Sequence, residues 1–394
     1  MNAAELQPGE PRLAASIELP IVAKQRAGAE LSIVIPTFNE RDNVVELVQR
    51  LGRALGDGSW EVVFVDDDSP DGTADLVREL AGTNSRVRCL QRIHRRGLSS
   101  ACLEGMLSSS APFLAVIDGD LQHDERLLPR MLEILKNEEI DIVVGSRYAP
   151  GGSIGGWDLR RARMSRIAVR LSRILVPPNL SDPMSGFFMM RSDVLKSTAH
   201  NLSAIGFKIL ADLFASSSQE LRFRELPYQF RNRHAGQSKL DSVTAWDYLM
   251  LLLDKLTGHI LPVRFVAFCI VGALGVGVHF AALSLITQAF GVAFIQGQAA
   301  ATLCAMTFNF AVNNVLTYRD RQLRGWRWLR GWLSFVLACS VGGFANLGAA
   351  KAMYDMHQGW ATAAITGVLV GAVWNYAITT LLTWRRPKGR PRSG

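Results

Sequence analysis

The feature that most constrains the fold is a sharp change in amino-acid composition after residue 262. Four long apolar stretches follow, at about residues 263–290, 292–316, 333–354 and 360–384, and they contain almost no acidic residues. A helix needs about 20 apolar residues to cross a bilayer core. Stretches this long and this poor in charge are rare inside water-soluble proteins, so the sequence predicts four transmembrane helices rather than four buried helices of a soluble domain.

The charges between these stretches predict their orientation. The connection at 319–330 carries five arginines and the tail at 385–394 is basic, whereas the other two turns carry no Lys or Arg. Basic loops stay on the cytoplasmic side, and no signal peptide is recognisable. We therefore expect a multi-pass protein of the cell (inner) membrane with its first half and both termini in the cytoplasm. Tryptophans that would form an aromatic belt at the span ends are Trp326, Trp328, Trp332, Trp360 and Trp384.

Composition narrows the class of protein further. Of 394 residues, 48% are hydrophobic and the mean hydropathy is +0.13, which suggests an average over a soluble and a membrane half. The net charge of +8 suits phosphate substrates or an anionic membrane surface as well as nucleic acid. Five scattered cysteines without a CxxC pair argue against a disulfide framework or a zinc site and favour a reducing compartment.

The first half has the pattern of an α/β domain. Short β-branched runs at 31–36, 61–67, 113–120 and 141–147 alternate with helical stretches such as 42–55 and 73–80. Runs of this kind are typical of strands buried on both faces of a mostly parallel, Rossmann-like sheet. In such open sheets ligands bind beyond the carboxyl ends of the strands. Asn39 and Ser69 stand where helix caps or turns are expected.

Two segments between the halves predict helices at the membrane surface. Residues 157–176 place leucines and isoleucines on one helical stripe and six arginines over much of the rest, and residues 245–261 form a second such stretch. This composition is typical of a cationic helix in the membrane interface. A solvated helix packed on the domain and a nucleic-acid-binding helix are the alternatives for 157–176, and the four neighbouring spans favour the interface.

Acidic clusters follow three of the predicted strands. The strongest is the run 118–123 (DGDLQH), in which Asp118 and Asp120 are separated by one residue; the others are 66–73 (DDDSPDGT) and 36–40 (PTFNE). Mg²⁺ and Mn²⁺ prefer oxygen ligands and typically use one or two carboxylates together with substrate phosphates. A lone DxD can be a solvated turn, but three polar strand ends on one sheet edge favour a site for a divalent cation and a phosphorylated ligand.

The ordered series IPTFNE, VDDDSPDGT, IDGDLQH, GSRY, DPMSGF and RNRHAGQSKL resembles the family 2 inverting glycosyltransferases of the GT-A fold. Within that family it is most similar to the dolichol-phosphate (polyprenyl-phosphate) mannose synthases. The segment 308–319 (FNFAVNNVLTYR) is similar to the four-span GtrA-like membrane domain. The implied organisation is an extension at 1–30 that we expect to be flexible, a GT-A domain at 31–240, a juxtamembrane helix within 241–262, a GtrA-like domain at 263–384 and a basic tail at 385–394.

The resemblance implies roles for individual residues. The nucleobase and ribose site would be lined by Pro36, Phe38, Glu40 and Asp67. The metal, Mg²⁺ or Mn²⁺, and the donor diphosphate would be held by Asp118, Gly119, Asp120 and Gln122, with Asp120 the main ligand. The donor phosphates would be covered by Arg233 and Lys239. The acceptor phosphate would be received by Arg147, Arg161 and Ser165. The expected catalytic set is Asp118, Asp120, Arg147 and Arg161.

Two positions depart from the family pattern. Asp68 stands where Asn is more usual, and His234-Ala235 replaces the more usual residues of the loop over the donor. His123 is expected to support the site rather than to act as a base. In the membrane half, Asn309, Asn313 and Asn314 are expected to form interhelical hydrogen bonds, and the glycines expected to permit close helix packing are Gly272, Gly275 and Gly277.

The reaction implied by the resemblance is transfer of mannose from GDP-mannose to a polyprenyl or dolichyl phosphate. The partners are then the nucleotide sugar, the lipid phosphate and the bilayer, with no nucleic acid. Two alternatives stay open: the same reaction with another donor such as UDP-glucose, and a membrane half that translocates the sugar-lipid. A binding scaffold without turnover would expect broken acidic motifs, and here they are intact.

Overall fold

The computed structural model describes residues 28–153, 169–170, 172–173, 175–204, 206, 208–231, 242–256, 261–356 and 359–385. Outside these ranges lie the first 27 residues, most of the predicted helix at 157–176 and the last nine residues. Six residues named above therefore have no described position: Arg161, Ser165, Arg233, His234, Ala235 and Lys239.

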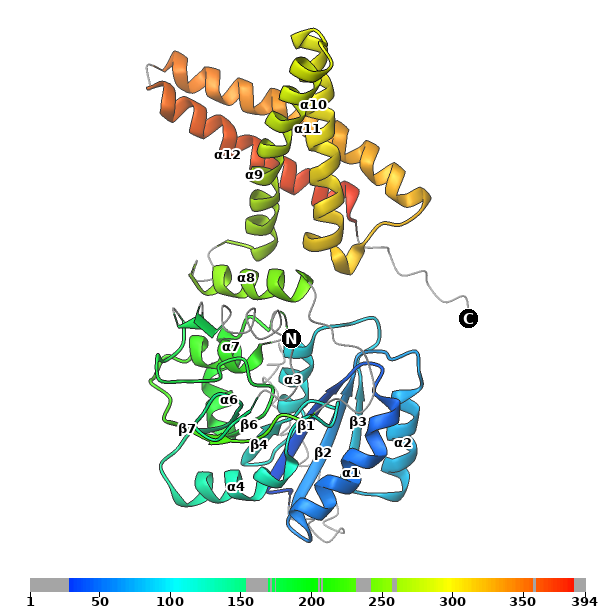
Figure 1. Cartoon of the computed structure of the whole chain (residues 1–394), viewed down its shortest axis with the longest axis vertical. Coiled ribbons are helices and arrows are strands. Elements are labelled where there is room, and N and C mark those ends of the chain that lie inside the picture. Colours follow the sequence, from blue (N-terminus) through cyan, green and yellow to red (C-terminus); the bar gives the residue numbers. More distant parts are fainter. Residues whose placement is uncertain are drawn as a thin grey trace, which may run out of the picture.

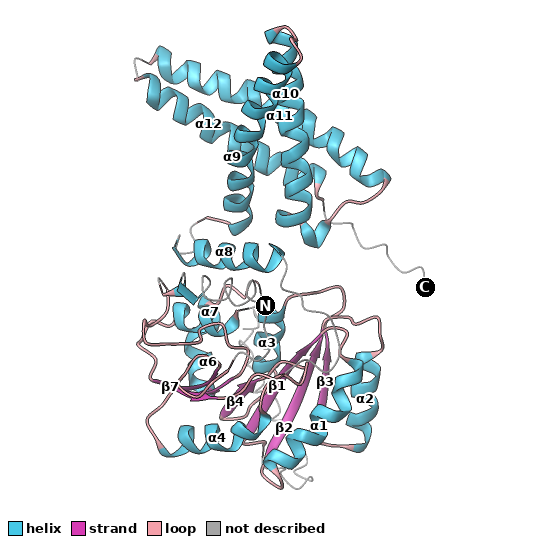
Figure 2. Ribbon diagram, viewed as in Figure 1, coloured by secondary structure: helices cyan, strands magenta, loops and turns pink. Residues whose placement is uncertain are grey.

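A seven-stranded sheet forms the core of the first half, in the order β3-β2-β1-β4-β6-β5-β7 (Figure 2). Only β6 runs against its neighbours β4 and β5, so the sheet is mostly parallel. The strands are β1 (Leu31–Thr37), β2 (Trp60–Asp66), β3 (Val87–Gln91), β4 (Phe113–Val116), β5 (Ile142–Ser146), β6 (Phe188–Arg191) and β7 (Phe223–Pro227).

Helices cover both faces of this sheet, because the strand side chains are apolar on both sides. One face packs on α1 (Arg41–Leu55), α2 (Thr73–Thr83) and α4 (Leu128–Asn137), the other on α3 (Leu98–Leu107), α6 (Ser192–Thr198) and α7 (Ile209–Ser216). Short 3₁₀ turns occur at Glu125–Leu127, Ala199–Asn201 and Arg319–Arg321. The predicted α/β class is thus confirmed.

The strand predictions need two corrections. The run at 113–120 ends as a strand at Val116, because its last residues leave the sheet to form the acidic turn. Strands β3, β6 and β7 were not predicted: β3 and β7 are edge strands with mixed polarity, and β6 is only four residues long. Asn39 and Ser69 lie in the turns before α1 and α2, which is one of the two expected outcomes, and neither of them caps a helix, since α1 and α2 begin after Glu40 and Gly72.

Among the described residues of the second half, four helices are long and apolar enough to cross a membrane: Val263–Ala289, Phe294–Thr317, Trp326–Asp355 and Ala361–Thr383. Their regular parts are α9 (Val263–Ser284), α10 (Phe294–Val312), α11 (Trp326–Asp355) and α12 (Trp360–Ile378), and π-helical turns extend three of them at Leu285–Ala289, Asn313–Thr317 and Thr379–Thr383. The third span begins at Trp326 rather than near 333, because its arginine-rich first turns are also helical.

Helix α8 (Ser242–Leu256) lies between the sheet domain and the spans (Figure 1). Its last turn enters the sheet domain, where the Lys255 ammonium forms a buried ion pair with Asp212 of α7 at 2.8 Å. Lys255 also donates to the backbone oxygen of Asn201 and to Ser216 Oγ, each at 2.8 Å, and Ser203 donates to Asp254. The predicted juxtamembrane helix is thus present, and it already includes Ser242, three residues before the predicted start.

Candidate functional site

The topology gathers the predicted site at one edge of the sheet. Parallel strands β1, β2, β4 and β5 end there, and their carboxyl ends carry Phe38, Asp67, Asp118 and Arg147 in turn. Strand β6 runs the other way, so the segment that precedes it, 182–187, reaches the same edge. Residues scattered over more than 100 positions of sequence therefore meet where open α/β sheets bind ligands.

Backbone strain is concentrated at this edge. Asn39, Asp68, His94 and Leu121 have positive φ angles of 59°, 59°, 56° and 63°, and they follow β1, β2, β3 and β4 respectively. Asn and Asp tolerate this conformation, but for Leu it costs roughly 1–2 kcal/mol. Leu121 is buried, and its strained backbone forms the turn that carries Asp120 and Gln122. Strain of this kind typically occurs where a binding site is held in one geometry.

His123 holds Asp118 in place. Its Nε2 lies 3.1 Å from Asp118 Oδ2, and its Nδ1 lies 2.7 Å from the hydroxyl of Tyr228, which follows β7. The ring is buried between Phe187 and Phe230, with centroid distances of 5.4 and 5.5 Å. When both ring nitrogens are engaged, the contact of one nitrogen determines which of the two carries the proton, and the ring orients the carboxylate beside it. The expected supporting role of His123 fits this geometry.

The electrostatic surroundings keep Asp118 ionised. Burial by itself raises the pKa of Asp118, but the hydrogen bond and charge of His123, with the charges of Lys208 and Arg147, outweigh it, and the net pKa is lowered. Burial raises the pKa of Tyr228 well above its ordinary value, so its hydroxyl stays protonated. The site therefore presents the Asp118 carboxylate as an anion, close to the protonated hydroxyl of Tyr228.

The acidic turn fits a divalent cation. Asp120 is buried beside Asp118, and its Oδ1 accepts from the backbone N–H of Gln122 at 3.2 Å. A Cβ at Gly186 would lie 2.6 Å from Asp118 Oδ2, so only glycine leaves room at that carboxylate. Among the described residues no three His, Cys, Asp or Glu side chains form a complete metal cage. Two carboxylates and an amide oxygen, completed by substrate phosphates, match the usual Mg²⁺ arrangement.

Gln122 links this turn to the loop that follows β7. Its Nε2 donates to the backbone oxygen of Arg231 at 2.9 Å, and the Arg231 N–H donates back to its backbone oxygen at 2.9 Å. Arg231 pairs with Asp124 and Glu125, each at 2.9 Å. Arg231 directly precedes residues 232–241, which lie outside the described residues and contain Arg233 and Lys239.

Arg147 makes a contact that the sequence analysis did not anticipate. Its Nε and Nη2 donate to the two oxygens of Asp182, both at 2.8 Å, with side-chain exposures of 8% and 0%. Burial by itself lowers the pKa of Arg147, but the carboxylate of Asp182 raises it by more. The net pKa is therefore raised and the guanidinium is charged. Its expected contact with the acceptor phosphate stays a prediction. Asp182 and Tyr228 were missed, although the DPMSGF motif contained the first.

The expected nucleobase side is built on a second buried pair. Asp67 accepts from Arg92 Nη1 at 2.8 Å and from the Gly97 backbone N–H at 2.7 Å. Burial raises the pKa of Asp67 despite these bonds. The Arg96 guanidinium stacks on the Phe38 ring, 4.2 Å from its centroid. Phe38 and Asp67 therefore lie on one side of the edge, and the basic loop 92–97, also missed from sequence, shapes it.

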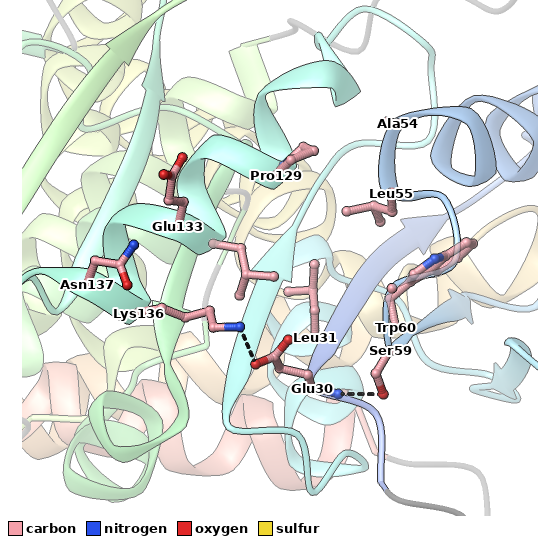
Figure 3. A pocket seen from close by; sticks show the side chains of 12 residues that line it. Glu30, Leu31, Ala54, Leu55, Ser59, Trp60, Pro129, Glu133, Lys136 and Asn137 are labelled. Atoms are coloured by element: carbon pink, nitrogen blue, oxygen red, sulfur yellow. Dashed lines mark hydrogen bonds and ion pairs between the residues drawn. The ribbon is translucent and has the colours of Figure 1, made fainter.

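A cavity of about 410 Å³ lies elsewhere, at the opposite edge of the sheet (Figure 3). It is lined by the start of β1 and β2 and by α4, with Trp60 and Pro129 on its walls and a 2.8 Å ion pair between Lys136 and Glu30. It lies where the strands begin, away from Asp118 and Asp120. Its position excludes it as the site of the chemistry described above.

Comparison with known proteins agrees with both halves. Residues 32–198 match glycosyl transferase family 2, and residues 267–384 match the GtrA/DPMS transmembrane domain. With the mostly parallel sheet, the acidic edge and the four spans, these matches define a multi-pass membrane glycosyltransferase with a GT-A catalytic domain.

Curated relatives narrow the class. The chain is 33% identical over 359 residues to a dolichol-phosphate mannosyltransferase of Pyrococcus furiosus, covering 90% of this chain and 99% of that one. The corresponding enzyme of Saccharomyces cerevisiae is 34% identical over 234 residues, covering 57% of this chain and 86% of that one. The chain belongs to the dolichol-phosphate mannosyltransferase family.

Among solved structures, the sheet domain is similar to glucosyl-3-phosphoglycerate synthase from Mycobacterium tuberculosis, in complex with Mn²⁺, UDP-glucose and phosphoglyceric acid. The identity is 18% and the TM-score 0.44, over 60% of this chain and 82% of that chain. A similarity this low says nothing about the ligands of the present chain.

Proposed function

We propose that this protein transfers mannose from GDP-mannose to the phosphate of a polyprenyl or dolichyl phosphate at the cytoplasmic membrane face. The observation that carries the proposal is the acidic turn of Asp118 and Asp120, held by His123 and Tyr228 at the ligand edge of the sheet. The 33% identity to a dolichol-phosphate mannosyltransferase over 90% of the chain supports the substrates.

The acceptor needs no general base. A phosphate monoester has a second pKa near 6, so it is already mostly dianionic at cytoplasmic pH. His123 has both ring nitrogens engaged, which suits a positioning role. In-line attack of the acceptor oxygen on the anomeric carbon inverts an α-linked donor and gives a β-linked lipid-phosphate mannose.

The reaction does need positive charge, because two phosphate groups must approach each other. Arginine suits this task, since its planar guanidinium binds phosphate bidentately. Arg147, fixed by Asp182, and Arg161 with Ser165 would receive the acceptor, and Arg233 and Lys239 would cover the donor. A divalent cation, Mg²⁺ or Mn²⁺, held by Asp118, Asp120 and Gln122 would stabilise the departing diphosphate.

Radiolabelled sugar transfer into the lipid phase tests the proposal. Purified full-length protein is offered GDP-mannose or UDP-glucose with polyprenyl phosphate, each with Mg²⁺ or Mn²⁺, and Asp120→Ala is the control. We expect label from GDP-mannose alone, lost in the variant and after chelation. Label from UDP-glucose alone would overturn the donor assignment, and transfer that persists in Asp120→Ala would overturn the assigned site.

The membrane orientation is tested separately by labelling introduced cysteines in intact cells. We propose that the arginine-rich connection is cytoplasmic and that the turn after Asp355 faces the other side. Met356→Cys should therefore react with an impermeant thiol reagent from outside, and Gln322→Cys only after permeabilisation. The reverse pattern would contradict the proposed topology.

A further inference from the structure

Two segments of the membrane half have the same sequence pattern. Residues 308–319 read FNFAVNNVLTYR and residues 374–385 read WNYAITTLLTWR, and they align without a gap at a spacing of 66. Five of the 12 positions are identical, and at the others aromatic stands for aromatic, aliphatic for aliphatic and Thr for Asn. Internal similarity of this kind indicates a repeated structural unit.

The two segments also share their backbone features. Each ends in a π-helical turn at equivalent positions, Asn313–Thr317 and Thr379–Thr383. At the first residue of each turn the side chain donates back to the oxygen four residues earlier: Asn313 to Asn309 at 2.9 Å, and Thr379 to Asn375 at 2.6 Å. Turns of this type are rare. Their presence at equivalent positions of both segments therefore supports a common structural unit.

The helices that precede these segments correspond as well. In α9 and α11 the buried faces contain matched residues 67 positions apart, namely Phe268 with Phe335, Val271 with Ala338 and Gly275 with Gly342. A Cβ at Gly275 would lie 2.2 Å from Asn309 Oδ1, and a Cβ at Gly342 would lie 1.9 Å from Asn375 Oδ1. Each hairpin thus packs a glycine of its first helix on the matched asparagine of its second.

The two hairpins meet through reciprocal contacts. Trp384 Nε1 donates to Asn314 Oδ1 at 3.2 Å, and the equivalent pair with the hairpins exchanged, Tyr318 OH and Thr380 Oγ1, lies at 2.6 Å. The rings of Tyr318 and Trp384, which are themselves equivalent, stack with centroids 4.0 Å apart and planes 4° apart. Both rings are fully buried.

We infer that the membrane half is two copies of one helical hairpin, residues 263–319 and 330–385, joined by a self-complementary interface. The pseudo-two-fold axis that relates the two copies passes between the stacked rings of Tyr318 and Trp384. We call the four residues of this interface the clasp: Asn314, Tyr318, Thr380 and Trp384. A reciprocal contact set is what two-fold symmetry requires, since residue i then contacts j and j contacts i.

The clasp joins the two hairpins at one end of the membrane half. It lies where α10 and α12 end, whereas the far tips of the two hairpins diverge (Figure 1). This end of the spans adjoins the arginine-rich connection, and Arg321 Nη1 of that connection donates to the backbone oxygen of Trp384 at 3.1 Å. The clasp therefore holds the second hairpin to the first, and it also accounts for the motif at 308–319 that the catalytic reaction does not use.

Matched substitutions test the equivalence of the two sides. In purified full-length protein, Tyr318→Leu and Trp384→Leu should each lower Tm by about 5 °C, and the double variant should lower it by clearly less than the sum. The control is Trp326→Leu at the start of α11, where the Trp326 side chain is 71% exposed, and it should leave Tm nearly unchanged. Additive losses, or a loss on one side only, would overturn the clasp.

A chimaera tests the duplication itself. Residues 330–385 are replaced by a second copy of 263–319, with the connecting loop retained, and a matched chimaera carries Asn→Leu and Tyr→Leu at the clasp positions of that second copy. The first chimaera should be monodisperse, with a Tm within about 5 °C of wild type, and the second should melt clearly lower. If the first is no more stable than the second, the hairpins are not interchangeable and the inference fails.

Discussion

The ligand edge of the sheet and the clasp of the membrane half are both dense hydrogen-bonded clusters, but they differ in the kind of side chain that forms them. The sheet edge uses formal charges in unequal roles, such as Arg147 with Asp182 and Arg92 with Asp67. The clasp uses neutral side chains in equivalent pairs, and its two aromatic rings are fully buried.

The difference follows from what each cluster does. A site for phosphates needs net charges that are held apart from one another, and the carboxylates of Asp67, Asp118 and Asp182 each have a different partner. A contact within the membrane gains most from packing and neutral hydrogen bonds, since an uncompensated charge there is expensive. Buried ion pairs should accordingly matter in the first half and be dispensable in the second.

The sharpest test of this contrast is at the border between the halves. Lys255→Met leaves the buried carboxylate of Asp212 without its ion-pair partner, which typically costs about 3–5 kcal/mol. We expect Tm of the full-length protein to fall by about 6–15 °C. The matched control is Lys351→Met, which breaks the exposed pair with Asp355 in α11 and should not change Tm measurably. Equal effects of the two would break the comparison.

The next largest effect is on catalysis at the acidic turn. Asp120→Asn keeps the shape of the side chain but removes its charge, so transfer should fall by about 10²–10³-fold while Tm is nearly unchanged. The exposed Asp75→Asn serves as the control and should retain full activity. A loss of less than tenfold would show that Asp120 does not contribute its charge to the reaction.

A smaller effect is expected when the support of Asp118 is removed. His123→Gln should weaken activation by Mg²⁺ about 10–100-fold, because groups that orient a metal ligand typically contribute that much. Tyr228→Phe removes only the hydrogen bond to His123 and should have a smaller effect in the same direction. The readout is the Mg²⁺ concentration at half-maximal transfer; a change in kcat alone would argue against the positioning role.

The smallest effect concerns Asp71 in the turn before α2. Burial alone raises the pKa of Asp71, but hydrogen bonds from Thr73 and from the Arg41 backbone outweigh it, so the folded pKa is lowered. A lowered carboxyl pKa stabilises the fold above the unfolded value of about 3.9, and this contribution is lost as pH falls through the folded pKa. Asp71→Asn should therefore lower Tm slightly at pH 7, with the difference shrinking below about pH 4. A difference independent of pH would exclude this cause.

Much of the fold could be predicted from sequence because its signals are local. Continuous apolar runs identified four of the seven strands, and hydropathy with charge placed all four spans. Strands β3, β6 and β7 were missed because short or half-exposed strands have no distinctive run. Glycine packing was predicted correctly at Gly275 but not at Gly272 or Gly277, where an added Cβ would meet nothing within 4 Å.

The sequence by itself determined the division into an α/β half and a membrane half, the family, and the acidic residues that follow the strands. These features depend on residue type and spacing. Only the tertiary structure decided the partners. Arg147 and Asp182 are 35 positions apart, His123 and Tyr228 are 105 apart, and Tyr318 and Thr380 are 62 apart. Contacts over such separations depend on how strands are ordered and helices cross, and a side chain does not encode its distant partner. The polar residues could therefore be recognised in the sequence, but which of them hold one another became visible only in the fold.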